Sequence, residues 1–219
     1  MSRIYTELSN LFKDNLTNVA KSLGYSTYNL LILAKDFKTL QLEFPEVWNS
    51  LMSCRHQKDK RTITEYALDL VASWVYEDVI LSELSKFFDI ELNGTDKKRE
   101  ILSSSKVKTD ADYLITSNGN STSVELVNSY TNYWKSSGKI DLRDNKFKKL
   151  ERNNSLLVCI DICNKDFFIL DVKNNKTLFK YIPYHKPWGK PAYQLDINNM
   201  ETTRLSLKNL TSELNKKVY

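Results

Sequence analysis

Two acidic residues stand in neighbouring apolar segments that a short turn separates. Asp112 directly precedes the apolar residues 113–115, and Glu125 lies inside the segment TSVELV at 122–127. Carboxylates on adjacent strands can hold one or two Mg²⁺ ions against a phosphate group, because the metal neutralises the charge that builds up during phosphodiester hydrolysis. The pattern makes Asp112 and Glu125 candidate catalytic residues and metal ligands, with Mg²⁺ as the candidate cofactor.

The turn between the two segments decides whether the carboxylates share a face of the sheet. The residues available for it are Ser-Asn-Gly-Asn at 117–120. A two-residue turn at 119–120 would set position 114 opposite 125 and make Asp112 and Glu125 diagonal neighbours on one face. A three-residue turn would put them on opposite faces unless a bulge intervened.

The order of these features resembles the PD-(D/E)XK nuclease superfamily, and type II restriction endonucleases are its most similar members. A helix with an acid, a strand, Asp112 before its apolar triplet, a turn, Glu125 inside a strand, a helix and a further strand follow one another over about residues 62–172. The resemblance implies that Asp112 is the first acid of the motif, with Asp110 as its alternative, and that Glu125 is the second. Glu77 matches the acid that some members carry on the preceding helix.

The resemblance also implies an activity and partners. The activity is Mg²⁺-dependent hydrolysis of double-stranded DNA at a short specific sequence, by direct attack of water on phosphorus. The implied partners are duplex DNA, a second copy of the chain in a two-fold dimer that reads a palindromic site, and a cognate DNA methyltransferase. Two alternatives remain open, namely a non-catalytic DNA-binding protein and a structure-specific repair or junction nuclease of the same fold.

The sequence departs from this family at Val127, two residues after Glu125, where the family's lysine usually stands. Members of the family can carry this lysine on another element that reaches the same point. Residues 139–150 (KIDLRDNKFKKL), projected as a helix, place Lys146 between two leucines on the inward face. Since an unpaired buried ammonium is unfavourable, Lys146 is expected to point at the carboxylates. Lys139 is the second candidate, and a Lys146 that merely reaches solvent is the alternative without a catalytic role.

The remaining pattern predicts an α/β (α+β) fold, in which a mixed β-sheet flanked by helices forms a restriction-endonuclease-like core. Residues 1–60 read as a helical N-terminal region, and residues 61–219 as the nuclease-like core with a C-terminal helix. Long amphipathic periodicity predicts a helix over 63–88, and a second core helix is expected over about 140–150. The predicted strands lie at 89–94, 112–116, 122–127, 155–162, 166–172, 176–184 and 192–197.

Several segments are candidates for DNA contact. The sequence AKSLGYST at 20–27 resembles the first helix and turn of a helix-turn-helix, in which the second helix lies in a major groove. A plain helical hairpin is the alternative. Exposed contacts of such a motif would come from Ser26, Thr27, Asn29 and Lys35. Elsewhere, aromatic residues beside lysines and a basic loop favour contact with phosphates or bases; these candidates are Tyr133, Lys135, Arg143, Lys186 and Lys190.

Composition sets outer limits on the function. Lys and Arg number 32 and Asp and Glu 27, so the formal charge of +5 is compatible with a nucleic-acid partner without requiring one. Three cysteines and two histidines offer no zinc-binding spacing, and no glycine-rich phosphate loop is present. No apolar stretch is long enough for a membrane span. We expect a soluble, intracellular protein, and the resemblance to restriction endonucleases implies the bacterial cytoplasm.

Overall fold

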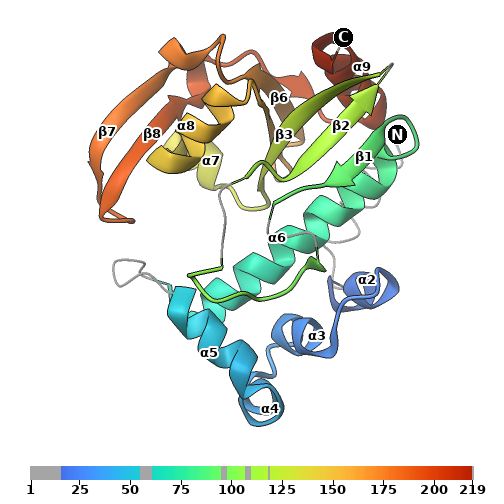
Figure 1. The fold of residues 1–219 in the computed structure, drawn as a ribbon, viewed down its shortest axis with the longest axis vertical. Coiled ribbons are helices and arrows are strands. Elements are labelled where there is room, and N and C mark those ends of the chain that lie inside the picture. Colours follow the sequence, from blue (N-terminus) through green and yellow to red (C-terminus); the bar gives the residue numbers. More distant parts are fainter. Residues whose placement is uncertain (1–15, 55–60, 95–97, 107–109, 118, 219) are drawn as a thin grey trace.

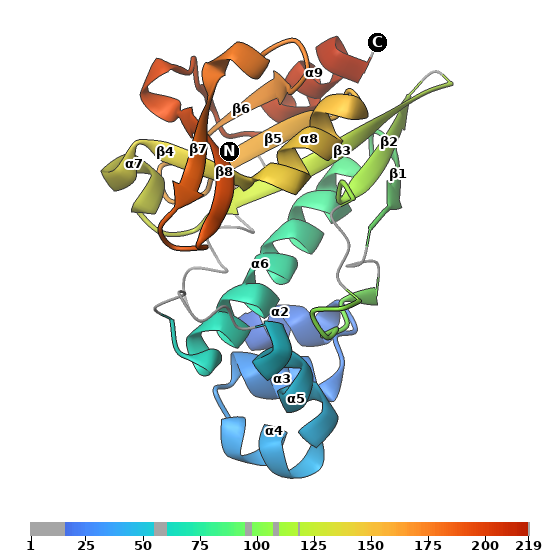
Figure 2. The same cartoon turned by 60° about the vertical axis from the view of Figure 1, so that its left-hand side comes forward.

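The computed structural model describes residues 16–54, 61–94, 98–106, 110–117 and 119–218. Over these ranges the fold is a mixed α/β arrangement of eight helices, one six-stranded sheet and one three-stranded sheet, as predicted. Short helices gather at one end of the molecule and both sheets lie at the other (Figures 1 and 2). Of the helical region predicted at 1–60, residues 1–15 and 55–60 lie outside the described ranges.

The N-terminal end is built from four short helices, and the long helix α6 joins them to the sheets. The four are α2 (Leu16–Ser22), α3 (Thr27–Leu33), α4 (Phe37–Glu43) and α5 (Pro45–Cys54). Helix α6 (Ile63–Leu84) begins at a capping box, in which Thr62 and Glu65 each bond the other's backbone N–H. The sequence of α6 is apolar around most of its circumference, so it is buried between the short helices and the large sheet (Figure 2).

The large sheet supplies the frame for the two acidic residues. Its order is β1-β2-β3-β5-β6-β9, and all neighbours are antiparallel except β3 and β5, which are parallel. The predicted strands of this sheet are confirmed, with β9 as an addition. The bounds are β1 (Asp89–Leu92), β2 (Tyr113–Ser117), β3 (Asn120–Ser129), β5 (Leu156–Asp161), β6 (Asp166–Asp171) and β9 (Thr203–Arg204).

The second sheet corrects one sequence prediction. Its order is β4 (Lys139–Arg143), β8 (Lys190–Asp196) and β7 (Phe179–His185). The prediction of a single helix over about 140–150 is wrong for its first part, because the helix α8 (Asp144–Arg152) begins only after β4. Within β4, Ile140 and Leu142 are buried and alternate with more exposed polar residues, which is the period of a strand rather than a helix.

Two apolar clusters pack on opposite faces of the large sheet. One cluster joins one face to α6, to the short helices and to α9 (Leu207–Val218), the predicted C-terminal helix. The other joins the opposite face to α8, to the short helix α7 (Tyr133–Ser137) and to the three-stranded sheet. None of the helices in the described part of the chain combines the length and apolar character needed to cross a lipid bilayer.

Candidate active site

The β2–β3 hairpin fixes the relation between the two acids. The strands pair from Tyr113 with Val124 as far as Ser117 with Asn120. Gly119 has a φ of +82°, a conformation that glycine adopts without steric penalty. Of the alternatives considered, a turn at 119–120 with position 114 opposite 125 does not form, since 114 pairs with 123. Continuing the observed register by one pair brings Asp112 directly opposite Glu125.

Asp112 and Glu125 lie on the face of the sheet that packs against α8. Val124 and Leu126 belong to the cluster on the α6 side, and side chains alternate along a strand, so Glu125 points to the other face. Asp112 is held against β3 by a hydrogen bond of 2.9 Å, in which the Leu126 backbone N–H donates to its Oδ2. Glu125 is buried, with 8% of the residue exposed. The hairpin thus presents two carboxylates to one point.

Lys146 reaches the same point from α8. Its Nζ lies 2.6 Å from Oε2 of Glu125 and 3.8 Å from Oδ1 of Asp112, and it donates to the backbone carbonyl of Asp110 at 2.7 Å. The next residue, Phe147, is buried in the apolar cluster between the large sheet and α8, and this contact fixes the rotation of α8 about its axis. The structure thereby brings together three of the predicted site residues, with an ammonium beside two carboxylates.

The cluster of Asp112, Glu125 and Lys146 has the electrostatic properties of a site that binds cations. Burial is the main cause that raises the pKa of Glu125 well above its usual range, and the neighbouring carboxyl of Asp112 raises it further. The Lys146 ammonium acts in the opposite direction and lowers it. Two carboxylates in a low-dielectric position repel one another, so the cluster is stabilised by cations that can approach both.

Val127, which stands where PD-(D/E)XK nucleases usually carry a lysine, shares the face of Glu125. It is partly buried and packs against the apolar cluster beneath α8, and it pairs with Cys159 of β5. A lysine there would enter the space between the sheet and α8 from the strand side. Lys146 enters that space from the helix side, while Lys139 is exposed on β4.

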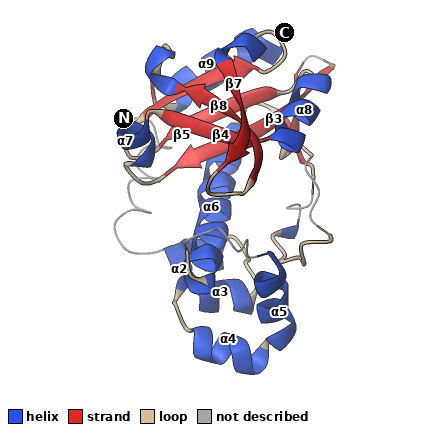
Figure 3. Ribbon diagram, turned by 90° about the vertical axis from the view of Figure 1, so that its left-hand side faces the viewer, coloured by secondary structure: helices blue, strands red, loops and turns tan. Residues whose placement is uncertain are grey.

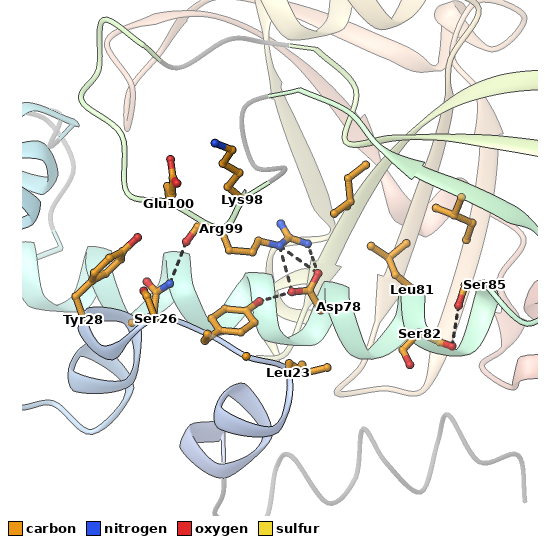
Figure 4. Close-up of a pocket in the computed structure, with 15 residues that line it drawn as sticks. Leu23, Ser26, Tyr28, Asp78, Leu81, Ser82, Ser85, Lys98, Arg99 and Glu100 are labelled. Carbon is orange, nitrogen blue, oxygen red and sulfur yellow. Dashed lines mark hydrogen bonds and ion pairs between the residues drawn. The ribbon is translucent and has the colours of Figure 1, made fainter.

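Glu77, the predicted acid of the preceding helix, is held on the α6 side of the sheet. Its Oε2 accepts a hydrogen bond of 3.0 Å from Arg99, and its Oε1 accepts one of 3.3 Å from Ser73. Arg99 also bonds Asp78, as Figure 4 shows, and Asp78 accepts a further hydrogen bond from Tyr25. Glu77 is thus part of a buried ionic network that joins α6 to the N-terminal helices.

A cavity of about 550 Å³ adjoins this network (Figure 4). It is lined by residues of the α2–α3 turn, α6, β1 and the segment around Arg99. Neither of the two carboxylates opposite Lys146 is among its lining residues, so the cavity is separate from the cluster on the α8 side. The site described above is instead a cluster of charged side chains at the start of β2 and the middle of β3.

The predicted DNA contacts of the N-terminal helices need one correction. Asn29 was expected to be exposed, but it is 1% exposed and its Nδ2 donates to the backbone carbonyl of Arg99 at 2.9 Å. The inward face of α3 carries Asn29 together with Ile32 and Leu33, so the polar side chain lies on the packed side. Thr27 and Lys35 are exposed and Ser26 is half-buried. The other predicted contacts are all exposed: Tyr133, Lys135, Arg143, Lys186 and Lys190.

The donor set fits Mg²⁺ better than a transition metal. Among the described residues, no group of three or more His, Cys, Asp and Glu side chains converges on one point. Two carboxylates are enough for Mg²⁺, which retains several waters and shares its coordination with substrate phosphate oxygens. Asp112 and Glu125 would be the protein ligands of such an ion.

Two contributions to this site have no signal in the sequence. The first is the backbone carbonyl of Asp110, which accepts a hydrogen bond from Lys146. The second is an ion pair between Lys149 and the side chain of Asp110. Asp110 was predicted only as an alternative metal ligand, whereas it contacts two lysines of α8.

Comparison of the sequence with known protein families and with curated proteins finds no match.

Proposed function

We propose that this chain is a Mg²⁺-dependent endonuclease that hydrolyses phosphodiester bonds of double-stranded DNA at a short specific sequence, as type II restriction endonucleases do. The observation that carries the proposal is the position of the Lys146 ammonium, 2.6 Å from Glu125 and 3.8 Å from Asp112. Two acids that can hold a metal ion and a lysine that can stabilise developing negative charge are groups that catalyse phosphodiester hydrolysis.

The order of elements supports the same proposal. Helix α6, strands β1, β2 and β3, helix α8 and strand β5 follow one another as the resemblance to PD-(D/E)XK nucleases implies, and β5 lies parallel to β3. The insertion of α7 and β4 before α8 does not displace α8 from the sheet. Such an enzyme would act in the bacterial cytoplasm as a two-fold dimer, with a cognate methyltransferase that protects the host's own sites.

Each residue has a distinct part in the reaction. Asp112 and Glu125 would hold Mg²⁺, which when bound supplies neutralising charge at the scissile phosphate. Lys146 is placed to stabilise the negative charge that develops on the phosphoryl oxygens and to donate a hydrogen bond to the attacking water. The Leu126 N–H fixes Asp112, and the Asp110 carbonyl fixes the Lys146 ammonium, so both side chains are oriented before the substrate binds.

The test is cleavage of plasmid or phage DNA by the wild-type chain in Mg²⁺, in Ca²⁺ and in EDTA. We expect discrete fragments in Mg²⁺ only, and their loss in Glu125→Ala. Glu201→Ala, which removes an exposed acid outside the cluster, is the matched control and should cut as the wild type does. Binding without cleavage in both Mg²⁺ and Mn²⁺ would contradict the proposal and favour a non-catalytic DNA-binding protein, while preference for branched DNA would indicate a structure-specific nuclease.

A further inference from the structure

We infer that the ribbon β7–β8, with its supporting strand β4, is the surface that docks duplex DNA, an inference that rests on the proposed nuclease function. The ribbon stands at the edge of the molecule in Figure 1, and its closed end points toward the helical end in Figures 1 and 3. Strand β7 is at the free edge of its sheet, so one side of the ribbon has no neighbouring strand in the described part of the chain.

Charge is concentrated on this element. Strand β4 and residues 179–196 contain five basic residues and two acidic ones, a net +3 out of a formal +5 for the whole chain. All five basic side chains are exposed: Lys139, Arg143, Lys180, Lys186 and Lys190. Of the two acids, Asp141 is largely buried, which leaves Asp196 as the exposed one. The ribbon therefore presents positive charge to solvent, which complements the phosphates of a duplex.

Apolar surface is interleaved with this charge. Leu178, Tyr181 and Tyr184 are 41%, 48% and 55% exposed, and all three lie on or directly before β7. Tyrosines between lysines can contact sugars and base edges while the ammonium groups bind phosphates. Beyond the pair of Ile182 with Ala192 the ribbon is no longer paired with β4, and this two-stranded closed end has the width that the major groove of B-form DNA accommodates. This combination favours duplex DNA as the occupant.

Buried contacts hold the ribbon in a fixed shape. At its closed end, Nε2 of His185 lies 3.1 Å from Oδ2 of Asp141, and Gln194 donates to Oδ1 of the same carboxylate at 2.8 Å. The turn is braced further by Trp188, whose ring contacts His185 and lies beneath the Arg143 guanidinium at 5.8 Å. A ribbon braced by side chains on two strands presents its lysines in a defined arrangement, which lowers the entropic penalty of binding.

The ribbon is joined to the helix that carries the proposed catalytic lysine. The ring of Phe147 stacks on that of Tyr193 of β8, with ring centroids 3.8 Å apart and an interplanar angle of 15°. Phe147 also contacts Phe179 at the start of β7 with centroids 4.9 Å apart. Phe147 directly follows Lys146. The packing of Phe147 on the ribbon therefore fixes the position of a docked duplex relative to the Lys146 ammonium and the two carboxylates.

The inference is tested by DNA affinity, measured without Mg²⁺ so that cleavage does not enter. Fluorescence anisotropy of a short labelled duplex would be recorded against salt for the full chain and for three triple Lys→Gln variants. The ribbon variant changes Lys180, Lys186 and Lys190. A helix variant changes Lys21, Lys35 and Lys38, and a matched control on α9 changes Lys208, Lys216 and Lys217. Circular dichroism confirms that each variant is folded.

Of the three variants, we expect only the ribbon variant to bind the duplex at least tenfold more weakly than the wild type. Each phosphate contact contributes about 0.9 to the slope of log affinity against log salt, so that slope should fall by about 2 to 3. Affinity unchanged in the ribbon variant, or lost only in the helix variant, would overturn the inference. A wild type that binds through the ribbon yet never cleaves would refute the proposed activity and leave the docking surface standing, whereas a wild type that binds no duplex would overturn both.

Discussion

The Nζ atom of Lys146 lies 2.6 Å from Oε2 of Glu125, although one residue belongs to helix α8 and the other to strand β3. The contact forms because α8 packs against the sheet face on which Glu125 is buried. A lysine two residues after Glu125 would approach the same space from the strand, and Val127 occupies that position. The structure therefore places a positive charge beside both carboxylates despite the valine.

The first prediction is that Lys146→Ala strongly slows Mg²⁺-dependent cleavage. Removal of one preorganised donor at a developing negative charge typically lowers the rate by about 10² to 10³, and we expect at least a 100-fold loss in single-turnover cleavage of plasmid DNA. Duplex affinity should change less than threefold, because the ammonium is held by the two carboxylates and the Asp110 carbonyl and contributes little free charge to the surface. Lys139→Ala tests the other predicted lysine, and Lys208→Ala, which removes an exposed lysine of α9, is the matched control. A loss of cleavage in Lys139→Ala equal to that in Lys146→Ala would contradict the assignment.

The second prediction is that a lysine at position 127 partly restores cleavage to Lys146→Ala. Glu125 and Val127 point to the same face of β3, so the new ammonium can reach the space that Lys146 vacates. Because Val127 packs against an apolar cluster, the substitution should also lower the free energy of unfolding by about 1–3 kcal/mol. Single-turnover rates of Lys146→Ala with and without Val127→Lys give the comparison. A double variant that folds yet is no faster would show that the two positions are not interchangeable.

The main chemical groups of the site could be predicted because each interrupts an apolar pattern. Glu125 is an acid within an apolar strand. Lys146 was placed on the inward face by a helical projection that included Leu142; Leu142 lies in β4, but Phe147 and Leu150 turn the same side of α8 inward. The observed pairing of Ser117 with Asn120 could not be distinguished from a turn at 119–120, since both fit the residues and differ only in hairpin register. Strand β4 was missed because its alternating pattern runs directly into the helical pattern of α8.

The roles of Arg99 and Asn29 could not be predicted, because they depend on long-range contacts. Arg99 follows two lysines in a polar segment that reads as solvated, yet its side chain is buried between two acids of α6. Asn29 reads as the exposed face of a DNA-reading helix, yet it binds the backbone of Arg99. Local patterns describe amphipathic faces, and they do not show which polar residue a distant segment will cover.

The third prediction concerns this buried network and the stability of the fold. Arg99→Gln leaves Glu77 and Asp78 without their guanidinium, and removal of one partner from a buried ion pair destabilises by about 3–5 kcal/mol. Urea unfolding monitored by tryptophan fluorescence measures the change. Arg61→Gln is the matched control, since its pair with Asp69 is exposed and should contribute no more than about 1 kcal/mol. Equal losses in both variants would contradict a special role for Arg99.

The fourth prediction is that Mg²⁺ stabilises the chain in the absence of DNA. A ligand at ten times its dissociation constant raises the free energy of unfolding by about 1.4 kcal/mol, which corresponds to roughly 3–6 °C in melting temperature for a chain of this length. Thermal melts in MgCl₂ should lie above melts in NaCl of equal ionic strength, and EDTA should reverse the shift. Asp112→Asn combined with Glu125→Gln should remove it, and a shift that survives in that variant would place the metal elsewhere.

The last prediction is a loss of stability at alkaline pH to which Tyr25 contributes. Burial raises the pKa of the Tyr25 phenol well above its usual value, and the charge of Asp78 raises it further. The unfolded chain then loses this proton near pH 10 while the folded chain keeps it, so the free energy of unfolding falls as pH rises above about 10. Below that pH the proton is bound in both states and the contribution of Tyr25 is fully present.

Tyr25→Phe should therefore make the alkaline decline shallower. One tyrosine contributes up to about 1.4 kcal/mol per pH unit to the slope, and the variant should lose that share between about pH 10 and 12. At pH 7 the variant should be less stable by about 1 kcal/mol, because the hydrogen bond to Asp78 is gone. Urea unfolding at a series of pH values gives both quantities. Tyr133→Phe, which alters an exposed ring, should leave the curve unchanged, and an equal effect from the two substitutions would show that the burial of Tyr25 is not the cause.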